Sequence, residues 1–476
     1  MTPAQKMRYF DMLCGIGFKQ IEIGFPAAAA DEFNFARQLI EGDHIPDDVT
    51  ISVLTQARPE LIERTMDALA GVKQAVVHFY IAASELHREF VFGKTRDEQI
   101  EMARAATVQI REAAAQMGDS RIGLEFSPEE FTDGDMEYML EVCDLVTQTW
   151  DRQPDEARVI LNLPATVERR LPHEYADMIE EFIERQAFPQ DTVVSLHAHN
   201  DMGMAVAATI QSLMAGAGRV EGTLMGHGER TGNVDLLTCA LDLEYLGVET
   251  GLCFDNLPEI VATVDEITGI KTHARHPYAG ELVFTAFSGS HQDAIRKGLA
   301  RRDELTAHFD GWKVPYLHVD PASVGRSFER FIRINSQSGK GGIAQVLEQD
   351  YQIRMPRWVQ IDFAAHVQAV ADREARELSG DEVWAIFRGC YKQHDGPVRL
   401  QKFWPRPDQH DPDQIDAEVH VHFAGADHVL RAAGNGPISA FVHALKQLDG
   451  VPDFRLLDYD EGTRGHSADA EGICFI

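Results

Sequence analysis

The chain of 476 residues contains no apolar run of about 18 residues, the length that a transmembrane helix requires. Its amino end, MTPAQKMRYF, also lacks the apolar segment of a signal peptide. The six cysteines are scattered, and no two of them form a Cys-x-x-Cys pair. These absences argue against a membrane span and predict a cytoplasmic protein whose thiols are reduced and mostly buried.

Basic residues are also scarce, since 44 lysines and arginines stand against 76 acidic side chains and leave a net charge of −32. Such a field repels phosphates, so nucleic acid and anionic membranes are excluded as partners. A phosphate-bearing co-substrate would need a locally basic or amide-lined pocket. The 44% hydrophobic and 25% charged residues are typical of a soluble globular protein, and the length predicts two or three domains.

Short strand-like runs alternate with amphipathic helical stretches over residues 1–273, which predicts βαβ units and a parallel sheet. The expected fold class is α/β, a (β/α)8-type TIM barrel. A doubly wound open sheet is the alternative, but no Gly-x-Gly-x-x-Gly follows the first strand. A closed barrel needs eight strands, and the chain opens with a helix. Either one strand escapes notice, or the chain begins after the first. The seven runs are 19–26, 49–54, 75–80, 122–126, 159–163, 193–197 and 220–224.

Polar residues collect where these strands end, which is where a barrel of this class builds its active site. His197 and His199 lie two apart at the end of a buried strand, so the period of two places both imidazoles on one face. Two such imidazoles are ready ligands for a divalent metal ion. The next strand end carries Gly226-His-Gly-Glu-Arg-Thr-Gly-Asn233, whose glycines allow backbone to approach a ligand closely.

The pattern changes after residue 273. Residues 274–404 are expected to form linker subdomains, with extended segments at 314–316 and 319–321, a loop at 335–342 and helices at 364–378 and 380–391. Residues 405–412 contain three prolines and two aspartates among other polar residues and predict a linker. Residues 413–476 predict a small α+β module: a hairpin of 417–423 and 428–433, a helix at 437–448, and strands at 454–459 and 472–476.

The two strand-end motifs together resemble the longer branch of the 2-isopropylmalate synthase family, within the metal-dependent Claisen-condensing barrels. The resemblance covers nearly the whole chain. Its further motifs are Gly24-Phe-Pro, Asn162-Leu-Pro-Ala-Thr166, Arg275-His-Pro-Tyr, Thr285-Ala-Phe-Ser-Gly-Ser-His-Gln-Asp-Ala294, Val314-Pro-Tyr-Leu317, Asn335-Ser-Gln-Ser-Gly-Lys-Gly-Gly342 and Gly434-Asn-Gly-Pro437.

The resemblance implies an acyltransferase that converts its acyl group into an alkyl group on transfer. It would join acetyl-CoA to 2-oxoisovalerate in the first committed step of leucine biosynthesis. A divalent ion (Mg2+, Mn2+ or Zn2+) would polarise the keto group as a Lewis acid. A base would remove a proton from the acetyl methyl group, and the thioester would then be hydrolysed. The family resemblance also implies a homodimer.

The same resemblance implies roles for particular residues. His197, His199 and Asn233 match the family's metal site, and Thr166 matches a position that hydrogen-bonds the oxo acid. His78 ends an early strand, so we expect it to point into the same site and to contact substrate. For Thr166 alone, without the family, a strand-end cap would be the commoner interpretation.

Three further residues match catalytic positions. Glu129 matches an acidic position that faces the substrate, although on its own it would read as a solvated surface carboxylate. His291 resembles the family's candidate base and Tyr316 its assistant, both in a segment that reaches over a partner subunit's site. Core packing is the alternative for the tyrosine. Arg230 and Lys340 are candidates for binding CoA phosphates, but neither is assigned.

The chain departs from the family pattern in three places. Family members carry an Arg-Asp pair on the opening barrel strand, and neither residue is present here. The ion would then have no anionic protein ligand, so its affinity should fall. Only the first of two similar units of the C-terminal leucine-sensing domain is evident, so leucine feedback is doubtful. Met202 stands where relatives usually carry a basic residue.

Three other interpretations remain at this stage. A citramalate- or homocitrate-type synthase would use another oxo acid, although the long segment containing His291 argues against it. An amidohydrolase-type barrel also uses His-x-His, but on its first strand. A catalytically impaired, truncated copy that dimerises with an intact one is the third.

Overall fold

The computed structural model describes residues 1–286, 288–328, 340–374, 378–392, 396–464 and 471–476. The chain divides into two compact units, each of which is described by itself. The first comprises residues 1–283 and 321–326, and the second comprises residues 284–320 and 327–476. None of the helices in these described ranges is both long and apolar enough to cross a membrane.

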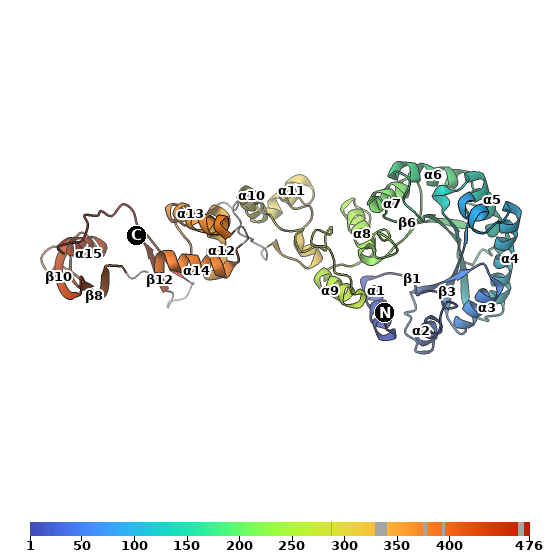
Figure 1. The fold of residues 1–476 in the computed structure, drawn as a ribbon, viewed down its shortest axis with the longest axis horizontal. Coiled ribbons are helices and arrows are strands. Elements are labelled where there is room, and N and C mark those ends of the chain that lie inside the picture. Colours follow the sequence, from blue (N-terminus) through green and yellow to red (C-terminus); the bar gives the residue numbers. More distant parts are fainter. Residues whose placement is uncertain (287, 329–339, 375–377, 393–395, 465–470) are drawn as a thin grey trace. The chain divides into compact units, whose positions relative to one another are not determined.

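The first unit is built on a curled, seven-stranded parallel sheet whose strands follow one another in sequence order. Helices cover its outer face (Figure 1), as in a TIM barrel. The seven predicted strands and the α/β barrel class are therefore confirmed. The strands are β1 (Gln20–Glu22), β2 (Thr50–Gln56), β3 (Gln74–Ala82), β4 (Arg121–Glu129), β5 (Val159–Ala165), β6 (Thr192–Ala198) and β7 (Arg219–Glu221).

The helices of this unit begin and end where the local sequence favours it. The side chain of Thr2 caps the first helix in a capping box, and Gly17 ends it in the left-handed conformation with φ 116°. Thr95 caps the fourth helix in the same way. The helices are α1 (Pro3–Ile16), α2 (Ala30–Glu41), α3 (Pro59–Ala68), α4 (Arg96–Ala115), α5 (Met136–Trp150), α6 (Pro172–Arg185), α7 (Ala205–Met214), α8 (Leu236–Tyr245) and α9 (Leu257–Thr268), with short turns η1 (Leu86–Val91), η2 (Phe131–Asp133), η3 (Leu224–Gly226) and η4 (Pro321–Val324).

The core of the unit lies between the sheet and these helices. All seven residues of β5 are buried, as expected for a central strand of a parallel sheet. The fully buried side chains include Phe79, Phe126, Trp150 and Phe182. Because the outward-facing side chains of the strands supply this core, the inward-facing ones are free to be polar.

The second unit begins with helices α10 (Gly289–Leu299) and α11 (Arg302–Phe309), followed by α12 (Lys340–Tyr351), α13 (Arg357–Glu374), α14 (Gly380–Phe387) and the turn η6 (Arg388–Lys392). Helix α12 was missed, because residues 335–342 were read as a loop; residues 335–339 lie outside the described part. Its apolar residues Ile343, Val346 and Leu347 share a core with α13 and α14. The extended segment predicted at 314–316 is also wrong, because Tyr316 lies in a turn with φ 61°.

The chain ends in a three-stranded antiparallel sheet, β8 (Val398–Pro407), β9 (Ile415–Phe423) and β10 (Ala426–Gly434), with α15 (Pro437–Leu445) packed on it, and a hairpin of β11 (Asp460–Arg464) and β12 (Glu471–Phe475). The predicted β9–β10 hairpin is confirmed. The linker predicted at 405–412 is wrong at its start, because β8 continues to Pro407. An edge strand tolerates proline, and β8 is the outer strand of this sheet. The strand predicted at 454–459 is also wrong, since pairing with β12 begins only at Asp460.

Candidate active site

The two histidines of the His-x-His motif lie together where β6 ends. His197 is the last residue but one of the strand, and His199 follows it directly. Their ring centroids are 5.3 Å apart and their planes differ by 15°. The imidazoles therefore share one face of the sheet, as the spacing of two residues predicts.

The Gly-rich loop places Asn233 opposite these histidines. The N–H of Val234 donates to the carbonyl of Ala198 at 2.8 Å, and His199 and Asn233 pair as an antiparallel β-bridge. Gly232, at φ 98°, makes this turn possible, because a Cβ there would lie 1.9 Å from the carbonyl oxygen of Gly226. The side-chain oxygen Oδ1 of Asn233 is buried and accepts no hydrogen bond.

These three side chains form a donor set that fits a divalent metal ion. Burial lowers the pKa of His197. Burial, with His197 and Arg230 nearby, lowers the pKa of His199 to about 4. Both imidazoles are therefore neutral at pH 7 and keep a lone pair for a metal. An unpartnered buried amide oxygen beside them costs free energy unless it finds a cation or a donor.

Arg230 connects the metal-site residues to the neighbouring strand end. Its guanidinium lies 3.0 Å from Nδ1 of His199 and donates to the backbone carbonyl of Thr166 at 2.7 Å. It also forms an ion pair with Asp201 at 2.7 Å, and this bond lowers the pKa of that carboxyl to about 2. Arg230 was left unassigned from the sequence, and these contacts give it a structural role at the site.

The predicted substrate residues Thr166 and Glu129 lie at the ends of neighbouring strands. Thr166 follows β5, and its hydroxyl accepts a hydrogen bond from the backbone N–H of Glu130 at 2.8 Å. Glu129 is the last residue of β4 and is half-buried. Burial raises the pKa of Glu129, His87 opposes this, and the Glu130 carboxylate adds to it.

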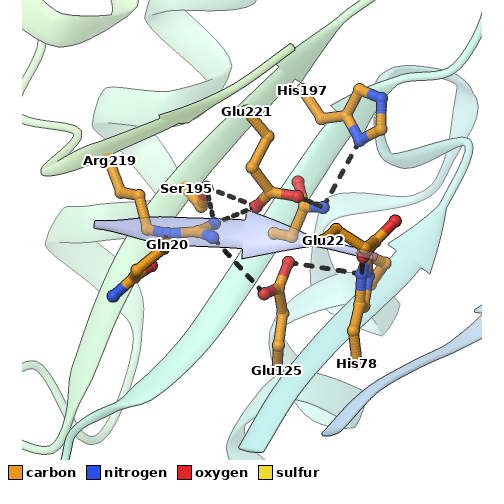
Figure 2. Close-up of polar contacts among 10 residues, drawn as sticks. Gln20, Glu22, His78, Glu125, Ser195, His197, Arg219 and Glu221 are labelled. Carbon is orange, nitrogen blue, oxygen red and sulfur yellow. Dashed lines mark hydrogen bonds and ion pairs between the residues drawn. The ribbon is translucent and has the colours of Figure 1, made fainter. Parts of the chain in front are cut away.

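His78, in the middle of β3, is buried within a network of charged side chains (Figure 2). Its Nδ1 is 2.8 Å from Oε2 of Glu22 and 3.5 Å from Oε1 of Glu125. Its Nε2 is 2.7 Å from the hydroxyl of Ser127. Glu22, His78 and Ser127 thus follow the order of a carboxylate–imidazole–hydroxyl triad.

The raised pKa of His78 argues against that role. Burial alone would lower its pKa, but the carboxylates of Glu125, Glu22 and Glu221 outweigh burial and raise it to about 10. A protonated imidazole donates both of its N–H groups and cannot act as a base toward Ser127 at neutral pH. His78 is instead a fixed positive charge in the interior of the barrel.

Arg219 and Glu221, both on β7, complete the network. Glu221 accepts hydrogen bonds from Ser195 at 2.6 Å and Asn162 at 3.0 Å, and it pairs with Arg219. Burial opposes ionisation of Glu221, but Arg219 and His78 outweigh it and lower its pKa to about 2. Glu125 behaves oppositely, because burial and the Glu221 charge raise its pKa well above the usual range.

The ligand atoms of His78, Glu125 and Glu221 lie within 4.8 Å of one another, which is close enough for a metal ion. In this cluster, however, the carboxylates are already compensated by the cations of His78 and Arg219. The His197, His199 and Asn233 set holds two neutral imidazoles and an unpartnered oxygen. That second set therefore has the uncompensated donor atoms that a metal ion needs.

Sequence reasoning missed this interior network, although a signal for it was present. Glu125 and Glu221 are charged residues within otherwise apolar runs, and charged side chains are seldom buried without partners. The residues of the network come from β1, β3, β4, β5, β6 and β7. No spacing in the sequence specifies those pairings.

The predicted base, His291, and its assistant, Tyr316, belong to the second unit. His291 lies in the first turn of α10, and both side chains are exposed. Their rings stack with centroids 3.9 Å apart and planes differing by 21°. The structure therefore brings together two residues that are 25 positions apart in the sequence.

Comparison with known proteins first gives the class. Residues 1–264 match the HMGL-like family, residues 281–348 match the alpha-isopropylmalate synthase post-catalytic domain-like family, and residues 377–476 match the LeuA allosteric (dimerisation) domain. Among solved structures, an HMG-CoA lyase from Bacillus subtilis covers 58% of the chain at 19% identity with a TM-score of 0.45. The family match over residues 1–264, more than half of the chain, identifies it as an enzyme with an HMGL-like barrel.

Full-length relatives then give the family. The 2-isopropylmalate synthase of Ralstonia nicotianae is 45% identical over 477 residues, covering 100% of this chain and 81% of the relative. Those of Rhodospirillum rubrum and Azotobacter vinelandii are each 45% identical over 100% of the chain, covering 85% and 83% of the relatives. The chain belongs to the 2-isopropylmalate synthase family.

Proposed function

We propose that this chain condenses acetyl-CoA with 2-oxoisovalerate and hydrolyses the product thioester to give 2-isopropylmalate and free CoA. The observation that supports the proposal most directly is the joint placement of His197, His199 and the unpartnered oxygen of Asn233 at the strand ends. The names of its full-length relatives supply the substrates. The family is metal-dependent and uses acetyl-CoA.

His197, His199 and Asn233 would hold the divalent ion, which when bound polarises the keto group of the oxo acid. The chain's own residues position the substrate. Thr166 donates a hydrogen bond from its hydroxyl to the oxo acid. His78 supplies a positive charge for the acidic end of the substrate.

His291 acts as the general base in this proposal. Its imidazole takes a proton from the acetyl methyl group, and the methyl carbon forms a bond with the keto carbon of the oxo acid. The keto oxygen gains a proton and becomes a hydroxyl. Water then adds to the thioester, and the CoA thiolate leaves and is protonated. Tyr316, stacked on His291, orients the imidazole, and Glu129 supplies an acidic group at the strand end.

The match to a dimerisation domain supports a homodimer as the working form. A cytoplasmic location is proposed from the six cysteines, all of which are free. The domain boundaries remain those predicted: a barrel over 1–273, linker subdomains over 274–404 and a regulatory module over 413–476.

The test is release of free CoA thiol from acetyl-CoA in the presence of 2-oxoisovalerate, with Mn2+, Mg2+ or Zn2+ added after chelation. We expect release to require a divalent ion and to fall about 100-fold or more in His199→Ala, since a ligand is lost. His173→Gln, an exposed change on α6, is the matched control and should retain full rate. Release that persists in chelator, or that prefers pyruvate or 2-oxoglutarate, would contradict the proposal.

A further inference from the structure

A hydrogen-bonded cluster lies beside the proposed substrate residues, where β3 and β4 end. Ser84 and His87 follow β3, and Glu130 follows β4. Ser84 is 0% exposed and Glu130 is 3% exposed. The same carboxylate oxygen of Glu130, Oε2, accepts a short hydrogen bond from the Ser84 hydroxyl and contacts Nδ1 of His87.

The backbone of Glu130 adopts a costly conformation. Its φ of 63° and ψ of 36° lie in the left-handed region, which costs a residue with a long side chain about 1–2 kcal/mol. Such a conformation persists when surrounding contacts determine it. Here the buried carboxylate supplies those contacts, because it is anchored by Ser84 and His87.

The consequence is a peptide N–H aimed at Thr166. The N–H of Glu130 donates to Oγ1 of Thr166 at 2.8 Å. A threonine hydroxyl that accepts from a fixed donor has its own hydrogen free to donate elsewhere. The carbonyl of Thr166 is held in turn by Arg230 at 2.7 Å, so this residue is restrained on both sides.

We propose that Ser84, His87 and Glu130 are positioning residues that hold the Glu130 N–H against Thr166, so that the Thr166 hydroxyl donates to the carboxylate of the oxo acid. The inference rests on the proposed function, since it takes Thr166 as a substrate contact. The three residues act through Thr166 and do not themselves touch the substrate.

The cluster is not a second catalytic triad. In a triad the hydroxyl bonds to the imidazole, whose other nitrogen bonds to the carboxylate. Here the hydroxyl and the imidazole both bond to one carboxylate oxygen, and the hydroxyl lies 3.5 Å from Nδ1 of His87, the same nitrogen that contacts the carboxylate. This arrangement anchors the carboxylate, and it lacks the relay of a triad, in which the two imidazole nitrogens serve different partners.

A double-mutant cycle tests the inference on the affinity for 2-oxoisovalerate, measured by calorimetry with Mn2+ present and acetyl-CoA absent. The variants are Ser84→Ala, Glu130→Ala and Thr166→Val, with each of the first two also combined with the third. We expect Ser84→Ala and Glu130→Ala to weaken binding about 5- to 20-fold in the unaltered background. In the Thr166→Val background the same changes should weaken it less than twofold.

The kinetic readout should agree with the binding data. The KM for the oxo acid should rise in Ser84→Ala, while the KM for acetyl-CoA stays within twofold. Glu85→Ala, an exposed change next to Ser84, is the matched control and should change neither value. Glu130→Ala is checked for folding by circular dichroism. If it does not fold, the comparison of Ser84→Ala in the unaltered and Thr166→Val backgrounds decides the test, because that substitution removes only one hydroxyl.

The possible failures are distinguishable. If the unaltered chain binds no 2-oxoisovalerate with Mn2+ present, the proposed function is wrong and the inference falls with it. If the unaltered chain binds 2-oxoisovalerate and Ser84→Ala and Glu130→Ala weaken binding equally in both backgrounds, the inference is wrong. The cluster then stabilises the turn at Glu130 without acting through Thr166. Binding that is unchanged in both single variants would likewise overturn the inference while the proposed function stands.

Discussion

At the scale of single residues, the interior of the barrel is organised by charge compensation. Glu125 and Glu221 would each be costly to bury alone, and His78 and Arg219 make their burial possible. The compensation is uneven, since the pKa of Glu221 is lowered while that of Glu125 is raised.

The raised pKa of His78 predicts how stability depends on pH. The ordinary value of 6.5 applies when the chain is unfolded, and the folded value is about 10. The protonated imidazole therefore contributes stability that is fully present below pH 6.5 and is lost as the pH rises through about 10. We expect the free energy of unfolding by urea to fall between pH 7 and pH 10. His78→Gln should be less stable than the unaltered chain at pH 7, and its free energy of unfolding should fall less over the same range.

The exposed His173→Gln variant is the control and should follow the unaltered chain across the whole range. If the free energy of unfolding changes equally with pH in His78→Gln and in the unaltered chain, His78 is not the group responsible for the pH dependence.

At the scale of elements, the loop from Gly226 to Asn233 is the part on which the proposed metal site depends most. It pairs with the end of β6 through His199 and Asn233 and turns back at Gly232. Its glycines permit backbone to lie against backbone. The loop also carries Arg230, which joins it to Thr166 and Asp201.

Two glycine substitutions near this loop distinguish the cost of a positive φ from the cost of a clash with an added Cβ. Gly203 and Gly232 both have positive φ, 79° and 98°, but a Cβ on Gly203 would meet nothing within 4 Å. We expect Gly203→Ala to cost about 1 kcal/mol of unfolding free energy and to leave Mn2+ affinity within twofold. Gly232→Ala should cost more than about 2 kcal/mol and weaken Mn2+ binding at least tenfold, because the loop must shift and carry Asn233 away.

Urea unfolding and calorimetric Mn2+ titration measure the two effects. Equal Mn2+ affinity in both variants would show that Asn233 and its loop do not contribute to metal binding.

At the scale of the whole molecule, charge dominates the expected association behaviour. The net charge of −32 is carried by each copy of the chain, and the last hundred residues match a dimerisation domain. Two such copies repel each other at long range, and salt screens this repulsion.

We therefore expect the dimer to tighten as salt rises. The dissociation constant from analytical ultracentrifugation should fall severalfold between about 20 and 300 mM NaCl, where the Debye length shortens from roughly 20 Å to 6 Å. A dissociation constant that rises with salt would instead indicate that complementary ion pairs across the interface outweigh the overall repulsion.

Much of the fold was predictable because the signals are local. Alternation of short apolar runs with amphipathic helices predicted all seven strands and the barrel class. Helix α12 was missed because the glycines at 341 and 342 were read as part of a loop, whereas the apolar stripe after them packs into a core. The linker at 405–412 was misread because two prolines suggested a break, although an edge strand tolerates them.

The sequence by itself determined the parts of the site that lie on one strand end or one loop. The spacing of His197 and His199 places their rings on one face, and the glycines before Asn233 permit a tight loop, both for reasons of local backbone geometry. Only the tertiary structure decided which strands face one another. It joined His78 to Glu22 and Ser127, and Glu130 to Ser84, His87 and Thr166, because these contacts form between strands whose neighbours are set by the curvature of the sheet.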